Sequence, residues 1–574
     1  MEGFVLEDEP SLQPAEAVKK GDVSLVYRRE QEKAWCSVLY IRQPLVDLQA
    51  KLDCFVADGS KKSRCYIRGP PGSGKTCFLY LWARFYSVLN QKRLLIVQFR
   101  EKDSCFIWIR ERDGSLYRMD EAVESSKLGA AVDDVITKNK NAKTPFDLCI
   151  HDGAIDKLRL CSEMLSKLNT AVTNGIFARV IHVTSLAFSL STGGQLLSVD
   201  GPVLRLSLDS WSEETYLEAV RCTAFINAME SNPGPFIQDL EQALVKDSET
   251  DNNSDDKDSG ADCSDDKGET LEEVVTEKYF FAGGSARFMF QFSLHELREE
   301  LDIRMGAVDN NEWQYFAQNA VASSTPSAVN TLMQEFNLRC SPVSKYVLIH
   351  AYNYCREQLV MSVRAAAVSS GNPTLMGWAF ELEQIHLIQT SLNSKDPDIK
   401  YVTNGNGWSF RPTSEVEFDE KKFQRYTCAP GSSIVIWCLK WNQGCFDVAF
   451  FMNATLITVQ FTVSEKHSLK PQYIRQLRQA LLDKKETVNK VLHVGVKEVD
   501  WQELEFKTDT RGTGRQINEE AAEFEIDVCR SPQLKEISGV DAEFNFTGTS
   551  SFMRSEKMYP LGRKRSRADP EEGH

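Results

Sequence analysis

Short apolar runs separated by amphipathic stretches recur along the first half of the chain. The runs are 64–67, Leu94–Phe99, Phe146–Asp152, Phe177–Thr184 and Val203–Leu208. Continuous apolar runs are typical of parallel strands that are buried on both faces, and helical segments lie between them. The pattern therefore predicts an α/β domain with a parallel three-layer α/β/α arrangement over residues 46–300. A hairpin over 107–112 and 116–119 is expected as an insertion in it.

Two polar stretches flank or interrupt this domain. Residues 1–45 form a polar lead-in, in which Trp35, Val38 and Leu39, with two later apolar residues, hint at a helix. Residues 247–270 are acidic, rich in Ser, Asn and Gly, and contain no large apolar residue. Such a segment buries too little surface to offset its ordering entropy, so we expect a disordered insert. An acidic interaction segment is the alternative.

The pattern changes in the second half of the chain. Residues 301–370 are mostly helical and form a connector, with an amphipathic helix over Tyr346–Ala367. A second α/β domain is expected over 371–505, with a helix at Leu375–Gln389. Two strands follow at Cys445–Phe451 and Leu456–Val463, and residues 506–574 are expected to be a flexible tail.

Composition narrows the function only a little. The chain has 574 residues and a formal net charge of −15, which argues against coating nucleic acid by bulk charge but leaves room for a local basic cleft. Its 15 cysteines contain no C-x-x-C pair and indicate reduced, buried thiols of an intracellular protein. The acidic start shows no secretory signal, and no apolar run is long enough to span a membrane.

The segment Cys65–Tyr80 carries the phosphate-loop pattern G-x-x-x-x-G-K-[ST], between a predicted strand and a predicted helix. Backbone N–H groups and the helix dipole would then point at a polyphosphate. Lys75 would neutralise phosphate charge, and the Thr76 hydroxyl would bind Mg²⁺. We predict that ATP and Mg²⁺ bind here. The predicted nucleotide-binding residues of the loop are Gly69, Pro70, Pro71, Gly72, Ser73, Gly74, Lys75 and Thr76.

Two more residues are candidates for the nucleotide site. Asp152 ends a buried strand, where a carboxylate can hold Mg²⁺ together with Thr76; a loop-capping acid is the alternative. Gly153 follows it where many ATPases carry a water-orienting glutamate, which leaves rapid hydrolysis open. Arg287 follows a Gly283-Gly284 break and could reach a γ-phosphate, although a lone helical arginine is more often a solvated surface residue.

The two strands near residue 450 suggest a second site. Their alternation places Asp447 beside Gln460, and Glu381 lies on the preceding helix. Carboxylates on a helix and a strand, followed by a polar residue one strand later, are typical of metal-dependent phosphodiesterases, with Asp447 as a metal ligand. Gln460 stands where the usual pattern has an acid, and Lys466 could replace its lysine. A hairpin with one buried-edge aspartate is the alternative.

In this order, the phosphate loop, GGSAR, GWAFE and the FDV…VQFTVSEKH pair resemble the Crinkler and retrotransposon hot spot proteins. The resemblance covers about Ser63 to Trp501. It implies a P-loop ATPase of the AAA/STAND type fused to a restriction-endonuclease-like domain. By this resemblance Arg287 is a second sensor, and the nuclease site consists of Glu381, Asp447, Gln460 and Lys466. The translocation header of secreted Crinklers is absent.

The tail adds a basic cluster at Gly562–Arg567. Its cations, Arg563, Lys564, Arg565 and Arg567, form a composition that a nuclear import receptor reads. The sequence thus predicts a nuclear ATP-binding and ATP-hydrolysing protein with a nuclease-like domain that acts on DNA. The alternative is a nucleotide-switched interaction or effector protein whose nuclease-like domain is inactive, with secretion into a host nucleus as the other location. A third possibility is an ATPase with an unrelated C-terminal domain.

Overall fold

The computed structural model divides the chain into two compact units, Met1–Leu348 and Ile349–His574. The boundary lies inside the predicted connector. The structure describes residues 4–7, 18–30, 33–57, 62–99, 104–119, 123–140, 146–154, 159–184, 203–231, 234–239, 266–317, 329, 331–336, 339–392, 399–401, 408–410, 414–419, 422–423, 433–438, 446–462, 466–469, 471–497, 505–508 and 525–530.

The first unit contains a nine-stranded sheet with the order β1-β7-β6-β5-β9-β10-β4-β11, and β8 pairs with β6. Its strands are β1 (Phe4–Glu7), β4 (Arg64–Arg68), β5 (Leu94–Phe99), β6 (Ser104–Arg110), β7 (Leu116–Met119), β8 (Val123–Glu124), β9 (Leu148–Ala154), β10 (Arg179–Thr184) and β11 (Val203–Ser207). The strands β5, β9, β10, β4 and β11 are parallel. These five are the predicted apolar runs, and the predicted hairpin is β6–β7.

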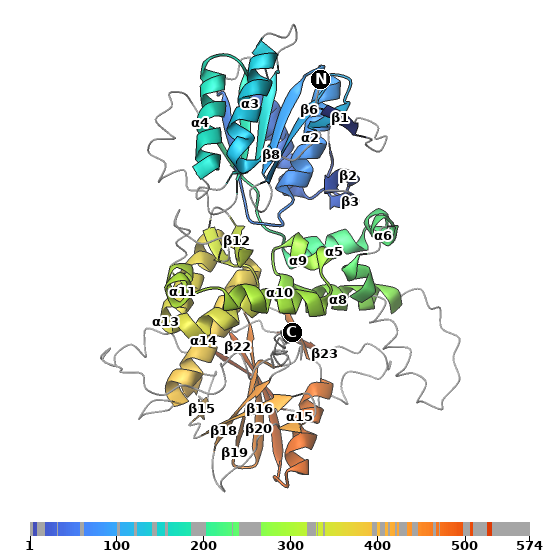
Figure 1. Cartoon of the computed structure of the whole chain (residues 1–574). Coiled ribbons are helices and arrows are strands. Elements are labelled where there is room, and N and C mark those ends of the chain that lie inside the picture. Colours follow the sequence, from blue (N-terminus) through green and yellow to red (C-terminus); the bar gives the residue numbers. More distant parts are fainter. Residues whose placement is uncertain are drawn as a thin grey trace, which may run out of the picture. The chain divides into compact units, whose positions relative to one another are not determined.

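Helices cover both faces of this sheet (Figure 1). Leu52 of α1 (Gln43–Val56) and Phe78 of α2 (Lys75–Asn90) share one core with Ile67 of β4. The other core contains residues of α3 (Ser125–Lys140) and α4 (Arg159–Thr173). The predicted three-layer arrangement is confirmed.

The expected helix in the lead-in is wrong. The strands β2 (Val23–Glu30) and β3 (Lys33–Tyr40) form an antiparallel hairpin there, and α1 begins only at Gln43. The apolar residues of this stretch fit the period of a helix as well as that of a strand, and the pairing with β2 selects the strand.

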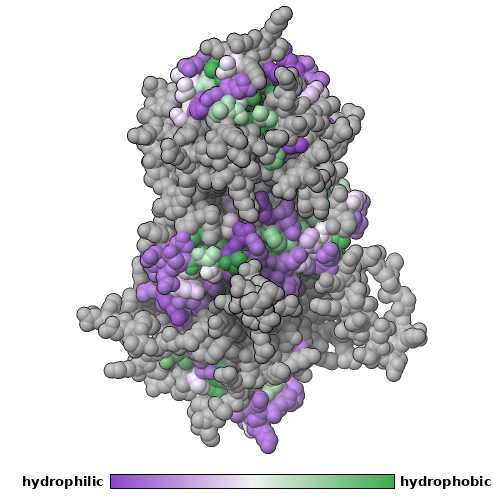
Figure 2. All heavy atoms as spheres, in the orientation of Figure 1, coloured by the Kyte–Doolittle hydropathy of each residue, from purple (hydrophilic) through white to green (hydrophobic). Residues whose placement is uncertain are grey.

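Helices follow the sheet in the first unit. They are α5 (Glu213–Arg221), α6 (Thr223–Glu230), α8 (Asp266–Ala282), α9 (Ala286–Gln291), α10 (Leu294–Gly306) and α11 (Asn310–Ala317). In α10 the side chains of Leu297, Leu301 and Met305 are buried at a four-residue spacing. The described surface over α10 and α11 is mainly hydrophilic in Figure 2. Because α8 begins at Asp266, the predicted disorder up to residue 270 ends too late; residues 247–265 lie outside the described part.

A short hairpin, β12 (Met333–Phe336) and β13 (Arg339–Pro342), interrupts the predicted helical connector. Its end packs against the turn between α8 and α9. Gly284 donates its N–H to Val343 O at 3.0 Å. Gly283 has φ +49°, and a Cβ there would lie 1.6 Å from the same oxygen, so only glycine fits.

The second unit begins within α13 (Lys345–Ser370), which is broken at Arg356 (φ +45°, ψ −129°) and is followed by α14 (Pro373–Leu392). Its sheet has the order β17-β16-β18-β19-β20-β22-β24. The other elements are β14 (Ile399–Tyr401), β15 (Trp408–Phe410), β16 (Ser414–Asp419), β17 (Lys422–Phe423), β18 (Ile434–Cys438), β19 (Val448–Met452), β20 (Thr455–Thr462), β21 (Lys466–Leu469), α15 (Pro471–Asp483), β22 (Lys490–Lys497), β23 (Glu505–Thr508) and β24 (Glu525–Arg530). Phe380 of α14 packs edge-on against Phe461 of β20, whereas Ile474 of α15 shares a core with Ala449 of β19.

Part of the predicted flexible tail is a strand. β24 pairs in parallel with β22, and Leu492 lies opposite Glu525. The basic cluster at 562–567 lies outside the described residues. In the part of the chain that the structure describes, none of the helices combines the length and the apolar character needed to span a bilayer.

Candidate nucleotide-binding site

The turn between β4 and α2 contains the predicted phosphate loop, and α2 begins at Lys75. Gly72 and Gly74 have φ of +78° and +94°, which L side chains rarely adopt. At Gly69 a Cβ would lie 2.5 Å from Leu208 O, so a side chain is excluded there as well. The predicted strand–loop–helix context is confirmed. It directs the N-terminal amides of α2 and the positive end of its dipole toward any phosphate bound at the loop.

The Lys75 ammonium lies over the loop itself. Its Nζ donates to Gly69 O and Pro70 O, both at 2.7 Å, and lies 3.4 Å from Ser73 Oγ. These acceptors are neutral dipoles. A phosphate oxygen accepts a stronger, charge-assisted bond, so an anion at the loop would draw the ammonium toward itself.

The structure brings the two predicted Mg²⁺ ligands together. Thr76 donates its hydroxyl to Asp152 Oδ1 at 3.1 Å. Asp152 lies on β9, which is separated from β4 by β10, and only 5% of its surface is exposed. A hydroxyl and a carboxylate at this distance are oxygen donors of the kind Mg²⁺ prefers, so the residues present fit the ion. Thr76 would hold the ion directly, and Asp152 would hold it either directly or through water.

A buried polar residue beside Asp152 was not predicted. Gln98 of β5 lies opposite Asp152 in the sheet and is 2% exposed. It is the next-to-last residue of an otherwise apolar run, and Thr184 is the last residue of β10. A polar residue near the carboxyl end of a buried strand is the signal that could have identified it.

One residue before Asp152, a buried histidine pair crosses the sheet. His151 and His182 lie opposite each other on β9 and β10, with their Nδ1 atoms 3.2 Å apart. Tyr66 of β4 stacks on His182 with ring centroids 4.7 Å apart. Burial lowers the pKa of His151 to about 3, and burial, His151 and Arg64 lower the pKa of His182 well below its ordinary value. Both rings are therefore neutral in the folded protein.

This pair predicts a pH-dependent stability. Below about pH 6.5 the unfolded chain binds protons that the folded pair cannot bind, so the free energy of unfolding falls by up to ~1.4 kcal/mol per pH unit for each histidine. The loss proceeds as the pH falls from about 6.5 toward the folded pKa values. Urea unfolding between pH 7.5 and about pH 5 measures the slope.

The matched control is His295, whose side chain is 81% exposed on α10. His182→Asn is expected to reduce the slope, and His295→Asn to leave it unchanged. Equal slopes in all three proteins would contradict the assignment of the slope to the buried pair.

The start of α9 lies against the phosphate loop. Ala286 donates its N–H to Gly72 O at 3.2 Å. A Cβ on Gly72 would lie 2.3 Å from Ser285 Oγ and 3.0 Å from Arg287 N, so these segments are in close contact. Arg287, the predicted sensor, is thus brought next to the loop, with an exposed side chain.

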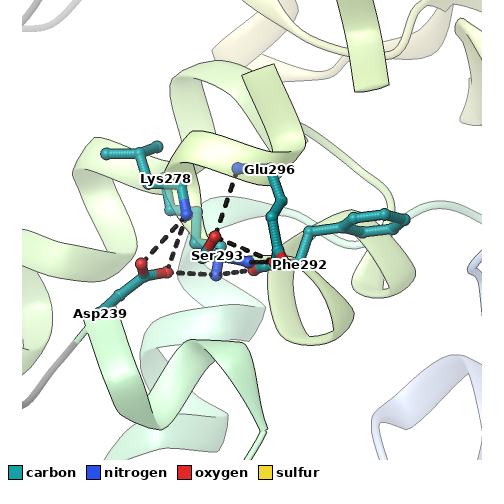
Figure 3. Close-up of polar contacts among 6 residues, drawn as sticks. Asp239, Lys278, Phe292, Ser293 and Glu296 are labelled. Atoms are coloured by element: carbon teal, nitrogen blue, oxygen red, sulfur yellow. Dashed lines mark hydrogen bonds and ion pairs between the residues drawn. The ribbon is translucent and has the colours of Figure 1, made fainter. Parts of the chain in front are cut away.

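A buried ion pair fixes the other end of α9 (Figure 3). Lys278 of α8 is 1% exposed; its Nζ lies 2.7 Å from Asp239 Oδ2 and also donates to Phe292 O. Asp239 in turn accepts the N–H of Leu294 at the start of α10. Ser293 and Glu296 form a capping box at this helix start. Lys278 therefore joins α8, α10 and the end of α9.

In the second unit the predicted site is brought together only in part. The Val448–Val459 pairing places Asp447 opposite Gln460, and Phe461 donates its N–H to Asp447 Oδ2 at 2.7 Å. Gln460 is 5% exposed, and its Oε1 has no hydrogen-bond partner within the described residues.

Glu381 comes from a different side of this sheet. It lies on α14, whose Phe380 contacts Phe461, and side chains at 460 and 461 point to opposite faces of β20. The side chain of Lys466 lies outside the described part. Among the residues described, no three His, Cys, Asp or Glu side chains form a group that could hold a metal ion. The role of all four residues stays a prediction.

Comparisons with known proteins find only distant similarity. No protein family and no curated protein matches the chain. Among solved structures, the Thermotoga maritima RuvB Holliday junction branch migration motor is 10% identical, with a TM-score of 0.25, over 53% of this chain and 93% of RuvB.

Two other solved structures resemble the chain to a similar degree. The replication initiator DnaA, bound to AMPPCP and single-stranded DNA, is 11% identical, with a TM-score of 0.23, over 61% of this chain and 89% of DnaA. Drosophila ORC bound to DNA is 11% identical, with a TM-score of 0.22, over 63% of this chain and 80% of that one. Because the scores are low, we base the function on the site geometry.

Proposed function

We propose that the first unit binds ATP with Mg²⁺ and hydrolyses it. The observation that carries the proposal is the 3.1 Å contact between Thr76 Oγ1 and Asp152 Oδ1 beside the glycine loop. The loop would hold the phosphates by its backbone amides and Lys75, and Mg²⁺ would stabilise charge on the β- and γ-phosphates. Arg287, next to Gly72, would bind the γ-phosphate.

Asp152→Asn tests this proposal. Asparagine keeps the shape but removes the negative charge that favours Mg²⁺, so we expect the Mg²⁺-dependent gain in ATP affinity to fall about tenfold, or ~1.4 kcal/mol. Titration of the full chain with a fluorescent ATP analogue, in Mg²⁺ and in EDTA, measures this gain.

The matched control is Asp133→Asn, which removes a 54% exposed carboxylate on α3. We expect it to bind ATP as the unaltered chain does. An unaltered chain that binds no ATP in Mg²⁺, or an Asp152→Asn variant with the full Mg²⁺-dependent gain, would contradict the proposal.

For the second unit we propose a metal-dependent nuclease-like domain of the Crinkler and retrotransposon hot spot type, acting on DNA. The support is the adjacency of Asp447 and Gln460 at the end of a hairpin in a mixed sheet. A second candidate is an inactive domain that serves as an interaction platform. The bond from Phe461 N–H to Asp447 supports this candidate, because it gives the aspartate a structural role that needs no metal.

Plasmid cleavage by the full chain in Mg²⁺ or Mn²⁺ distinguishes the two candidates. Asp447→Ala is expected to abolish cleavage if Asp447 binds the metal, whereas Asp483→Ala, at the exposed end of α15, should cleave normally. If the unaltered chain cleaves no more plasmid than the Asp447→Ala variant does, the interaction platform remains as the function of this unit.

We also propose that the chain acts in the nucleus, imported through Arg563, Lys564, Arg565 and Arg567. A fluorescent fusion in which these four residues are alanine is expected to lose nuclear accumulation. An unchanged distribution would contradict this role.

A further inference from the structure

A buried arginine outside the phosphate-loop motif contacts that loop. Arg42 precedes α1 and is 2% exposed. Its guanidinium donates to Ser73 O at 3.0 Å, to Ser210 O at 2.8 Å and to Asp209 O. Ser73 belongs to the phosphate loop, whereas Asp209 and Ser210 follow β11. One side chain therefore joins two segments that are far apart in the sequence.

The segment after β11 continues these contacts to the start of α9. Arg42 lies 5.3 Å from the centre of the Trp211 ring. The backbone N–H of Trp211 donates to Gly284 O at 3.0 Å. A Cβ on Gly284 would lie 2.6 Å from Ser210 Cβ, so the two backbones are closely packed.

The start of α9 then returns to the phosphate loop through the bond from Ala286 N–H to Gly72 O. The contacts thus form a closed ring that runs from Arg42 to the loop, to α9, to Trp211 and back to Arg42. Burial lowers the pKa of Arg42 to about 10, so the side chain is still charged at neutral pH. The three backbone carbonyls that accept hydrogen bonds from the guanidinium stabilise this charge.

We propose that Arg42 is a positioning residue that holds the phosphate loop and the start of α9 at a fixed spacing, so that nucleotide binding and docking of α9 are linked. This inference rests on the proposed nucleotide site. A guanidinium suits the task because its planar fork reaches several acceptors at once, whereas an ammonium is a point charge. Through this ring of contacts, nucleotide binding at the loop affects the position of α9, the helix that carries Arg287.

Arg42→Lys tests the inference in the full chain. Lysine keeps the charge but cannot bond both segments in the same geometry. We expect the affinity for a fluorescent ATP analogue to fall about tenfold. The matched control is Arg110→Lys, because Arg110 is 1% exposed and donates to Gly114 O at 2.9 Å, away from the loop. We expect the control to change affinity less than about twofold.

Gly284→Ala separates positioning from a local structural role. The added methyl group would lie 2.4 Å from Gln334 Oε1 and 2.6 Å from Ser210 Cβ, so it displaces the start of α9 without touching the phosphate loop. If Arg42 acts through this docking, Arg42→Lys lowers affinity much less in the Gly284→Ala background than alone. Full additivity of the two effects would overturn the inference.

Hydrogen exchange provides a readout that needs no nucleotide. In Arg42→Lys we expect the amides of Trp211 and Ala286 to exchange about tenfold faster, and in Arg110→Lys to exchange as in the unaltered chain. Unchanged exchange in Arg42→Lys would overturn the inference. ATP binding that is equal in Arg42→Lys and the unaltered chain would also overturn it and would leave the proposed function standing. If the unaltered chain binds no ATP, the proposed function itself is contradicted.

Discussion

Lys75→Ala is expected to weaken ATP binding about 100-fold. The ammonium is the one cation of the loop motif, and its charge-assisted bonds to phosphate contribute ~1.5–3 kcal/mol, or roughly ten- to a hundredfold in the dissociation constant. Nothing else in the loop replaces it, because the other groups that face a phosphate are backbone amides. Equilibrium titration of the full chain with a fluorescent ATP analogue measures the change.

The control for this prediction is Lys92→Ala, since Lys92 pairs with Asp147 at the surface beyond the far end of α2. The control is expected to bind ATP normally. Lys75→Ala also removes the bonds to Gly69 O and Pro70 O, so thermal unfolding of the variant should be measured alongside. A folded Lys75→Ala variant with unchanged affinity would rule out the loop as the phosphate site.

Lys278→Met is expected to lower the free energy of unfolding of the first unit by ~3 kcal/mol. Methionine fills a similar volume, but it leaves the Asp239 carboxylate, which is 11% exposed, without its cation. Breaking a buried pair by removing one partner is strongly destabilising. Burial lowers the pKa of Lys278, and the Asp239 carboxylate opposes this effect through its charge and its hydrogen bond to Lys278. Urea unfolding at neutral pH measures the loss.

The exposed pair of Lys20 and Glu218 supplies the control, because its side chains are 46% and 34% exposed. Lys20→Met is expected to leave the free energy of unfolding nearly unchanged, because an exposed ion pair contributes little to stability. Adding Asp239→Asn to Lys278→Met should recover part of the loss, because the uncompensated charge is then gone. Equal stabilities of Lys278→Met and Lys20→Met would contradict the role of the buried pair.

The residues of the candidate nucleotide site can be proposed from the sequence because their signals are local. The glycines, Lys75 and Thr76 lie within one short segment, and Asp152 is marked by its place at the end of an apolar run. Each of these residues can be identified from the sequence pattern of the strand or helix beside it.

The missed features depend on distant partners. Arg42 donates to Asp209 O and Ser210 O, which are 167 and 168 residues away along the chain, and no pattern around Arg42 indicates this. The β2–β3 hairpin and β24 are short segments of mixed polarity, whose state is decided by pairing and not by propensity. In the second unit the hairpin register is predictable from alternation, whereas the position of Glu381 depends on which face of the sheet α14 covers.

The contact of Gly283 with Val343 O closes a long loop of chain, which contains α9, α10, α11 and the β12–β13 hairpin. Because the two ends of this loop already touch, lengthening it costs little closure entropy, about 0.6 kcal/mol for each doubling. The length of chain between Gly283 and Val343 can therefore change at little cost as long as this contact is kept. A fluorescent reporter domain inserted between these two residues is expected to leave the contact, and with it the start of α9 beside the phosphate loop, in place.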